Sequence, residues 1–455
     1  MRYSLFLGAA ALVAASPAPQ AFDVNQFNAL PNNVAQGPKA GVTAESAYNQ
    51  AQAQNTAAAA ATGAATAQQA KRSVGAQLEA RDPTFWWNWN QAQNNKPAPA
   101  PTPAPAPAPA TTAAPAANPS STNLAPSSCS PVDWTNTYAF TADPACATQI
   151  EVGTYCGFIN PDDPCAAQPN AYGPPTTPDT ADAFKKNEVY HKLATSAKTP
   201  SGYESSFVDL SASVEGSGYL GYYELTSYDT AACSAKCDST STCTGFNLYI
   251  ERDPKWNPRQ CSCDKPDSVT RFKCTLWGQD VKKESATNVG QGQDGFEVVI
   301  VGSNGYNKAT YSPPTPPSCS KPQSCGHKLH NQQPFCMGQT TFPGPFDPSL
   351  CAAYAQKQNE VNRKRGIIGM WLSMFGMNKG GCVQFQAAYL EKEGKGFGTH
   401  CRLFTKKFTP AQANLDISVG GSSQWGCQKS FTWDVDVNAS FNWGGWSYFK
   451  AKRDE

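Results

Sequence analysis

The sequence predicts an α+β, disulfide-rich fold in which two copies of one small module follow a disordered Ala/Pro-rich N-terminal region. Three observations support this prediction. All 17 cysteines lie between Cys129 and Cys427. One ordered pattern of cysteines and aromatic residues occurs twice, and each copy combines a helix pattern with strand patterns. We therefore expect each module to be an antiparallel sheet with a helix that disulfides pin to it.

The first residues predict a secretory signal peptide. A basic residue, Arg2, precedes an apolar stretch at residues 5–13 and the small residues 14–16, which is the order that secretory leaders have. We expect residues 1–15 to be removed and the protein to be secreted, either extracellular or associated with the cell wall. In that oxidising compartment the cysteines are expected to form disulfides, and their odd number leaves at least one without a partner in the chain.

Residues 16–72 are predicted to be a disordered pro-segment. The pair Lys71 and Arg72 ends this segment, and a dibasic-specific protease would cut there, although the two could also be ordinary surface charges. Residues 51–70 are rich in Ala, Gln and Thr. A helix over these residues would have no apolar stripe to bury, so it would not hold alone.

The next segment, residues 73–128, is predicted to be a disordered arm and stalk. Four of the five residues 85–89 are aromatic, and they could dock on the folded part or stack on sugar rings. Residues 97–110 are Pro and Ala with a single Thr, which favours an extended polyproline II spacer. The folded part is then divided into a first module with an N-terminal extension, residues 129–310, and a second module, residues 311–455.

The internal repeat is the most informative pattern in the chain. An aromatic-Asp pair, a Cys, a Cys-x-x-Phe, a Tyr-x-Glu-basic and a Cys-x-Leu-aromatic recur in the same order, with one extra residue between the Phe and the Tyr of the second copy. The matched residues are Asp229 and Asp347, Cys233 and Cys351, Cys243 and Cys382, Phe246 and Phe385, Tyr249 and Tyr389, and Cys274 and Cys401.

Each copy is expected to begin with a capped helix. Asp229 and Asp347 suit helix N-caps, because a carboxylate there accepts hydrogen bonds from free backbone N–H groups and faces the positive end of the helix dipole. In the first copy Cys233 and Cys237 are four residues apart, so they lie on one face of the helix.

Strands follow the helix of the first copy. Residues 246–251 alternate between apolar and polar side chains, which predicts a half-buried strand. Residues 296–301 predict a second strand, and the sequence Gly-Ser-Asn-Gly at 302–305 predicts the turn that ends it.

Three segments carry a resemblance to a known family: Cys243–Pro254, Lys273–Gly278 and Val299–Tyr306. They resemble the PAN/apple superfamily, and more closely a family of secreted fungal proteins with PAN-like modules, over residues 129–445. The resemblance implies rigid, disulfide-held scaffolds that bind protein or carbohydrate. It also implies three disulfides: Cys233–Cys274, Cys237–Cys243 and Cys351–Cys401.

The second copy departs from the family pattern at one cysteine. Ala355 occupies the position that matches Cys237, so Cys382 loses the partner that the resemblance implies. We expect Cys382 to pair with Cys427 or Cys336 instead. The partners of Cys261 and Cys263 stay open.

No catalytic motif with specific spacing occurs in the sequence, and no cofactor is predicted. The best candidate for a metal site is Cys325, His327, His330 and Cys336, two His and two Cys within twelve residues, which could surround a zinc ion. Because the compartment is oxidising and Cys319 is close in sequence, we expect a disulfide with surface histidines there and no metal.

The second copy also carries a long insert between its helix cysteine and its strand cysteine. Residues 363–377 begin with three basic residues, and Ile367, Trp371 and Phe375 then recur at one helical turn. Such a stretch is typical of an adaptable contact surface for a partner or an anionic membrane face. The alternative is a helix extension that packs on its own module.

The charge balance of the chain and the length of its apolar runs argue against two classes of protein. Lys and Arg number 36 against 35 Asp and Glu, which argues against a nucleic-acid-binding protein. No apolar run in the body of the chain is long enough to span a membrane. We expect a secreted, non-enzymatic binding or structural protein that recognises carbohydrate or protein at a cell wall or matrix. The oligomeric state and the identity of the ligand are not predicted.

Aromatic residues are the candidate ligand contacts, and Asn438 is a predicted N-glycosylation site. The candidates are Tyr249, Trp277, Trp443 and Trp446; Trp433 lies in an alternating pattern and suits a core position equally well. Two other functions stay open. One is a hydrolase of wall polymers that uses two facing carboxylates, and the other is a host-directed effector that uses the insert 363–377.

Overall fold

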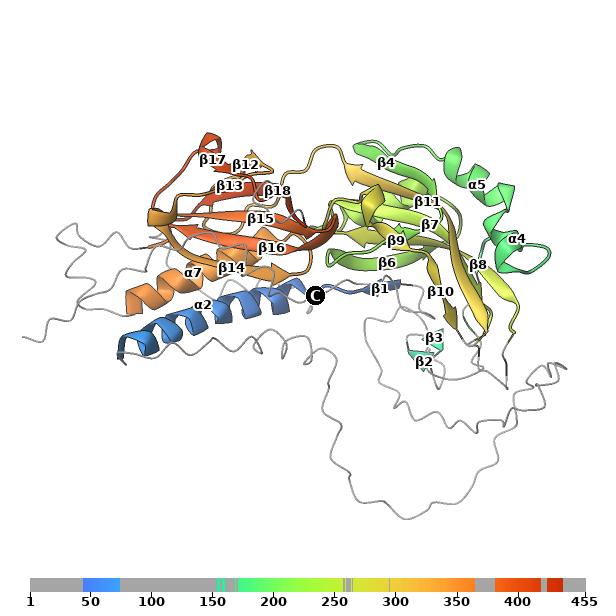
Figure 1. The fold of residues 1–455 in the computed structure, drawn as a ribbon, viewed down its shortest axis with the longest axis horizontal. Helices are drawn as coiled ribbons and strands as arrows, with labels where there is room; N and C mark the ends of the chain where they lie inside the picture. The colour runs from blue at the N-terminus through green and yellow to red at the C-terminus, as the bar shows by residue number, and fades with distance from the viewer. Residues whose placement is uncertain are drawn as a thin grey trace, which may run out of the picture.

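The computed structural model describes residues 44–73, 154–155, 158–159, 168, 171–256, 258, 263, 265–293, 295–364, 381–418 and 424–436. These residues form two large antiparallel sheets and three small two-stranded sheets (Figure 1). The α+β class with antiparallel sheets and disulfides is thereby confirmed. Several predicted features lie outside the described residues: residues 1–15, the arm and stalk from residue 74 to 128, Cys261, Asn438, Trp443, Trp446 and residues 365–377 of the insert.

The first module contains a seven-stranded sheet in the order β1-β6-β8-β7-β11-β10, with β4 paired to the second half of β11. Its strands are β1 (Ala44–Ser46), β4 (Tyr203–Leu210), β6 (Tyr219–Leu225), β7 (Gly245–Pro254), β8 (Ser268–Trp277), β10 (Gly290–Gln293) and β11 (Phe296–Lys308). Its helices are α4 (Ala181–Lys185), α5 (Glu188–Thr195) and α6 (Thr230–Asp238).

The second module contains a five-stranded sheet in the order β12-β18-β15-β16-β14. Its strands are β12 (Gln323–Gly326), β14 (Cys336–Pro343), β15 (Gln384–Lys392), β16 (Lys395–Phe404) and β18 (Trp425–Asp434), and its helix is α7 (Pro348–Lys364). Smaller elements are the strand pairs β2 (Thr154–Tyr155) with β3 (Phe158–Ile159), β5 (Ser213–Val214) with β9 (Ala286–Asn288), and β13 (Leu329–His330) with β17 (Ala413–Leu415), and the 3-10 helices η1 (Lys283–Ser285), η2 (Gln333–Phe335) and η3 (Pro410–Gln412).

The two modules share one topology. The chain runs β6, α6, β7, β8, β11 in the first and β14, α7, β15, β16, β18 in the second, and the sheet orders β6-β8-β7-β11 and β14-β16-β15-β18 match. The registers match as well. Leu248 pairs with Cys274, and Ala387 pairs with Cys401. The repeat seen in the sequence is therefore a repeat of structure.

The register corrects one part of the sequence repeat. Tyr249 pairs with Lys273 on the face away from α6, whereas Tyr389 pairs with Thr399 and belongs to the core under α7. The single extra residue before Tyr389 moves its side chain to the opposite face, because side chains alternate along a strand. The two tyrosines are therefore not equivalent positions.

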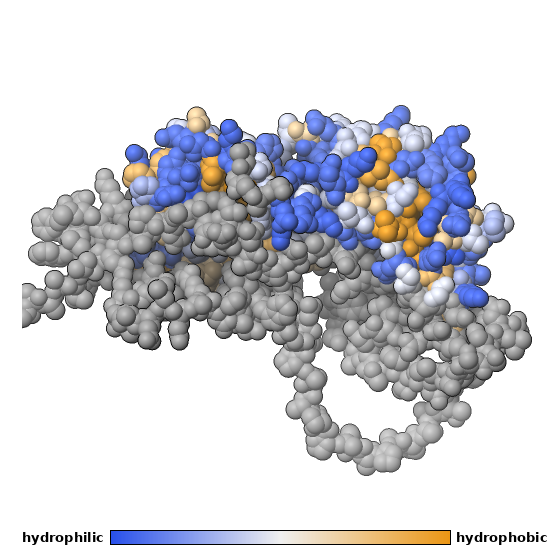
Figure 2. All heavy atoms as spheres, viewed as in Figure 1, coloured by the Kyte–Doolittle hydropathy of each residue, from blue (hydrophilic) through white to orange (hydrophobic). Residues whose placement is uncertain are grey.

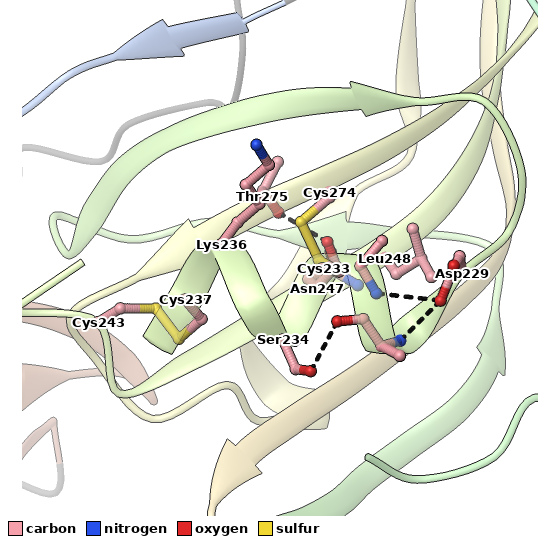
Figure 3. The surroundings of a disulfide bond; sticks show 12 residues. Asp229, Cys233, Ser234, Lys236, Cys237, Cys243, Asn247, Leu248, Cys274 and Thr275 are labelled. Carbon is pink, nitrogen blue, oxygen red and sulfur yellow. Dashed lines mark hydrogen bonds between the residues drawn. A yellow bond between two sulfur atoms is a disulfide. The ribbon is translucent and has the colours of Figure 1, made fainter. Parts of the chain in front are cut away.

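Disulfides hold each helix on its sheet, and Figure 3 shows those of the first module. Cys233 of α6 is joined to Cys274 of β8, and Cys237 is joined to Cys243 just before β7. Cys351 of α7 is joined to Cys401 of β16. These are the three pairs that the resemblance implied.

Both helices begin at the predicted aspartates. Asp229 accepts hydrogen bonds from the backbone N–H groups of Ala231 and Ala232 at 2.9 and 3.0 Å (Figure 3). Asp347 accepts a hydrogen bond from the N–H of Ser349 at 2.9 Å. The prediction of two N-caps is confirmed, and the carboxylates satisfy donors that the helices leave unpaired.

Two strand predictions need correction. β7 is buried along its whole length and is not half-buried, because its polar side chains are enclosed together with those of β8. The segment 302–305 does not end a strand, since β11 continues to Lys308 and the register shifts between Val301 and Asn304. Gly302 has a φ of 58°, so the glycine-rich segment forms a bulge within one strand.

The disorder predicted for residues 16–72 does not hold where the structure describes them. Residues Ala44–Ser46 form β1, which adds to the edge of β6, and Gln50–Ser73 form α2, which lies alongside α7 (Figure 1). Ala57 and Ala61 are fully buried in the core of the second module. The helix is held by tertiary packing that its own composition does not reveal. We call residues 44–61 the strap.

Polar contacts join the two modules. The N–H of Phe346 donates to the carbonyl of Gly278 at 2.7 Å, and the N–H of Ser217 donates to the carbonyl of Gly396 at 2.9 Å. Three ion pairs surround these bonds: Lys282 with Glu391, Lys395 with Glu215, and Lys429 with Asp280. The loop after β8 therefore meets the β15–β16 hairpin and β18.

The missing disulfide of the second module can be restored by one substitution. Ala355 matches Cys237, and both Ala355 and Cys382 are fully buried in one core cluster. Ala355→Cys is expected to bond Cys382 and to raise the free energy of unfolding by on the order of 3 kcal/mol. Alkylation of the denatured, unreduced protein should then count one reactive thiol fewer than in the wild type. One thiol more would contradict the equivalence, and Ala355→Cys with Cys382→Ala is the control that forms no new bond.

Candidate functional site

A cavity of about 290 Å³ opens where the strap meets the first module. The turn after α6 supplies four successive hydroxyl side chains, Ser239 to Thr242, while the strap supplies the ring of Tyr48 and the amide of Gln50, and Leu220 of β6 supplies an apolar wall. The volume is close to the lower end of the range for small-molecule sites. Closely spaced hydroxyl and amide groups beside an aromatic ring can both donate to and accept from a polyhydroxylated ligand.

A buried carboxylate holds the two strap residues that line the cavity. Asp347 has no exposed surface. Its Oδ2 accepts a hydrogen bond from the hydroxyl of Tyr48 at 2.7 Å and another from Nε2 of Gln50 at 3.0 Å. Burial, followed by the charge of Asp347, raises the pKa of Tyr48 far above its usual value. Tyr48 therefore stays a neutral hydrogen-bond donor, and its ring is held in one position.

A second candidate is a buried ionic cluster on the face of the first sheet that α6 does not cover. Its charged members come from three adjacent strands: Glu224 from β6, Glu251 and Asp253 from β7, and Arg271 and Lys273 from β8. Arg271 lies 2.6 Å from Glu224 and 3.1 Å from Asp253, and Lys273 bonds both Glu251 and Asp253. No side chain of the five is more than 13% exposed.

The cluster contains three acids and two bases, and its protonation follows from this imbalance. Burial, and then the neighbouring charge of Asp253, raises the pKa of Glu251 to about 8. Burial alone would also raise the pKa of Asp253, but the charges of Lys273 and Arg271 and a hydrogen bond from Glu251 lower it. At neutral pH Glu251 thus holds a proton that it shares with Asp253, and the cluster has no net charge.

Among the residues that the structure describes, the hydroxyls of Tyr222 and Tyr249 and one carboxylate oxygen of Glu224 find no hydrogen-bond partner. On the face of the second sheet that α7 does not cover, carbonyls of residues 328 and 330 accept hydrogen bonds from strand side chains. There the carbonyl of Lys328 accepts from Gln386 and Ser430, and the carbonyl of His330 accepts from Arg402. At the register positions of Glu251 and Arg271 the second sheet has Leu390 and Gly398, so the second module does not repeat the ionic cluster.

The two predicted aromatic contacts that the structure describes, Tyr249 and Trp277, lie inside the protein. Tyr249 belongs to the ionic cluster and Trp277 packs beside Tyr219, and neither Tyr249 nor Trp277 has exposed surface. Trp433, for which the sequence left a ligand contact and a core position open, is 1% exposed and stacks on Phe385 with centroids 5.1 Å apart. The aromatic ring that faces the cavity, Tyr48, lies in a segment that the sequence assigned to a pro-segment.

The predicted metal candidate and the unpaired cysteines differ from expectation. His330 is buried rather than on the surface, and burial lowers its pKa to about 4. The thiols of Cys319, Cys325 and Cys336 are free, so the expected disulfide is not formed. Within the described ranges no three metal-binding side chains come together. Cys382 is bonded to neither Cys336 nor Cys427, all three thiols are free, and burial raises the pKa of Cys382 to about 12.

The part of the surface that Figure 2 colours by hydropathy is mostly hydrophilic. Figure 2 shows hydrophilic residues gathered where the two modules meet and a hydrophobic patch on the first module. Val208 and Val289 of that module are 46% and 65% exposed. No helix in the described part of the chain is long and apolar enough to cross a membrane. Comparisons with protein-family models, curated proteins and solved structures find no match for this chain.

The proton on Glu251 predicts a pH dependence of stability. A carboxyl group whose folded pKa lies above its unfolded pKa stabilises the fold below the unfolded value, and that stability is lost as the pH rises through the folded pKa. Between about pH 5 and pH 8, the free energy of unfolding of the wild type should fall relative to that of Glu251→Gln, by at most about 1.4 kcal/mol per pH unit. Urea unfolding at several pH values measures both slopes. Parallel slopes would show that Glu251 is ionised throughout.

Proposed function

We propose that this protein is a secreted, non-enzymatic binding protein that recognises carbohydrate of a cell wall or matrix through PAN-like modules. The observation that supports this proposal is the hydroxyl-lined cavity between the strap and the first module. Its lining offers hydroxyl donors and acceptors, one amide and one aromatic ring, which are the groups that hydrogen-bond and stack on a sugar. Its size suits one sugar unit of a longer chain.

Two further features support this proposal. Each helix is joined to its sheet by a disulfide, and disulfides are typical of proteins that act in oxidising compartments. The repeated order of a helix followed by sheet strands, with the cystine at the same register position, fits the PAN-like modules that the sequence resembles. Such a rigid frame holds the turn after α6 in place without a ligand.

The two alternative functions stay predictions. A wall hydrolase needs two carboxylates that face each other in a groove. The described cavity is lined instead by hydroxyl, amide, aromatic and aliphatic side chains, and Glu251 and Asp253 are bound to Lys273. An effector that uses the insert 363–377 depends on residues that lie largely outside the described part.

Calorimetric titration of the secreted full chain with β-glucan and N-acetylglucosamine oligosaccharides tests the proposal. We expect saturable binding to at least one of these series. Ser241→Ala combined with Thr242→Val removes two hydroxyls from the cavity and should weaken that binding about tenfold or more, because each lost hydrogen bond costs about 1 kcal/mol.

The matched control is Ser206→Ala, which removes an exposed hydroxyl of β4 on the same module. This variant should bind as tightly as the wild type. If the wild type binds neither series, or if the cavity double variant binds with unchanged affinity, the cavity does not hold carbohydrate.

A further inference from the structure

We propose that the strap is a peptide clasp that stays bound to both modules when the chain is cut at Lys71-Arg72. The sequence assigned residues 16–72 to a segment that processing would remove. The structure instead places residues 44–61 of that segment in the fold. The mature protein would then consist of two chains held together without a covalent link.

The first contact of the strap is made through its backbone. In β1, Ala44 pairs with Tyr223, Glu45 with Tyr222 and Ser46 with Gly221. The N–H of the next residue, Ala47, donates to the carbonyl of Leu220 at 2.9 Å. This is strand addition to the edge of a sheet, a common way for proteins to bind extended peptides. The strap therefore covers the β6 edge of the first sheet.

The second contact lies at the start of α7 in the other module. One oxygen of the buried Asp347 accepts from the strap residues Tyr48 and Gln50, while the other oxygen caps α7 through Ser349. Gln54 also donates to the hydroxyl of Ser349 at 2.6 Å. In the described part of the chain, Asp347 has no ion pair, so the strap supplies the hydrogen bonds to one of its oxygens. Release of the strap would leave that oxygen without these donors.

The third contact is apolar. Ala57, Ala58 and Ala61 are 0%, 6% and 0% exposed, and Ala57 and Ala61 join the core cluster of the second module. Small side chains allow α2 to lie close along α7 (Figure 1). One short segment thus combines an edge strand, a buried hydrogen-bond network and a packed helix, and it spans both modules.

The dibasic pair lies beyond these contacts. The contacts described above lie at or before residue 61, whereas Arg72 is the penultimate residue of α2, where helix ends open most readily. A dibasic-specific protease would hydrolyse the Arg72–Ser73 bond with one water molecule, which leaves a carboxylate on Arg72 and an amine on Ser73. No contact between the strap and the modules is lost in that step.

The test is a controlled cut of the full chain. A recognition site for a sequence-specific protease is inserted between Ser73 and Val74, and the secreted protein is cut and passed over a size-exclusion column without denaturant. We expect the N-terminal fragment to elute with the folded modules. Elution of the fragment by itself, with the modules either folded or aggregated, would overturn the proposal.

The contacts themselves are tested with a fluorescent label on the fragment. Tyr48→Phe with Gln50→Ala removes both strap donors to Asp347 and should speed the loss of label to excess unlabelled fragment at least tenfold. The matched control is Gln52→Ala, an exposed residue of the same helix, which should release the fragment at the wild-type rate. Equal rates for all three proteins would show that Asp347 does not hold the strap. The assay measures retention only, so its result does not depend on whether the cavity binds carbohydrate.

Discussion

Both modules depend on one constraint, the cystine that joins the helix to the second strand after it in the chain. Cys233–Cys274 and Cys351–Cys401 join the same points of two helices and two sheets, and the strand residue opposite each cystine occupies the same register position, Leu248 or Ala387. A crosslink of this kind limits how the helix can slide or rotate over the sheet. Each helix therefore covers one fixed face, and each sheet keeps a second face for polar groups.

The two modules use that second face differently. In the first module it holds a charged cluster in which one proton balances three acids against two bases. In the second module His400 takes the position of Lys273, but Leu390 takes that of Glu251. Gln386 and Arg402 lie further along the strands and donate to the carbonyls of residues 328 and 330. Both modules keep the same arrangement of helix on sheet, because the disulfide and the helix cap occur in both. The strap then joins the modules from outside, through one sheet edge and one helix.

The local patterns predicted much of the fold. The two N-cap aspartates and the repeat follow from local patterns, whereas the three disulfides follow from the resemblance to PAN-like modules. Tyr389 was misplaced because the sequence repeat matched residue type, whereas one inserted residue reverses the face of a strand. The strap was missed because an alanine-rich helix shows no apolar stripe, and its partner α7 lies far along the chain. The cavity depends on the same distant pairing, since Tyr48 and Gln50 meet Ser239–Thr242 only in three dimensions.

Peptide mapping of the secreted protein by mass spectrometry without reduction tests the duplicated scaffold most directly. Digestion should give one crosslinked peptide that contains Cys351 and Cys401 and another that contains Cys233 and Cys274, with Cys382 recovered as a free thiol. A crosslink between Cys351 and Cys382, or a Cys233 that is joined to no strand cysteine, would mean that the two helices are not pinned at equivalent points. The account of two copies of one scaffold would then be wrong.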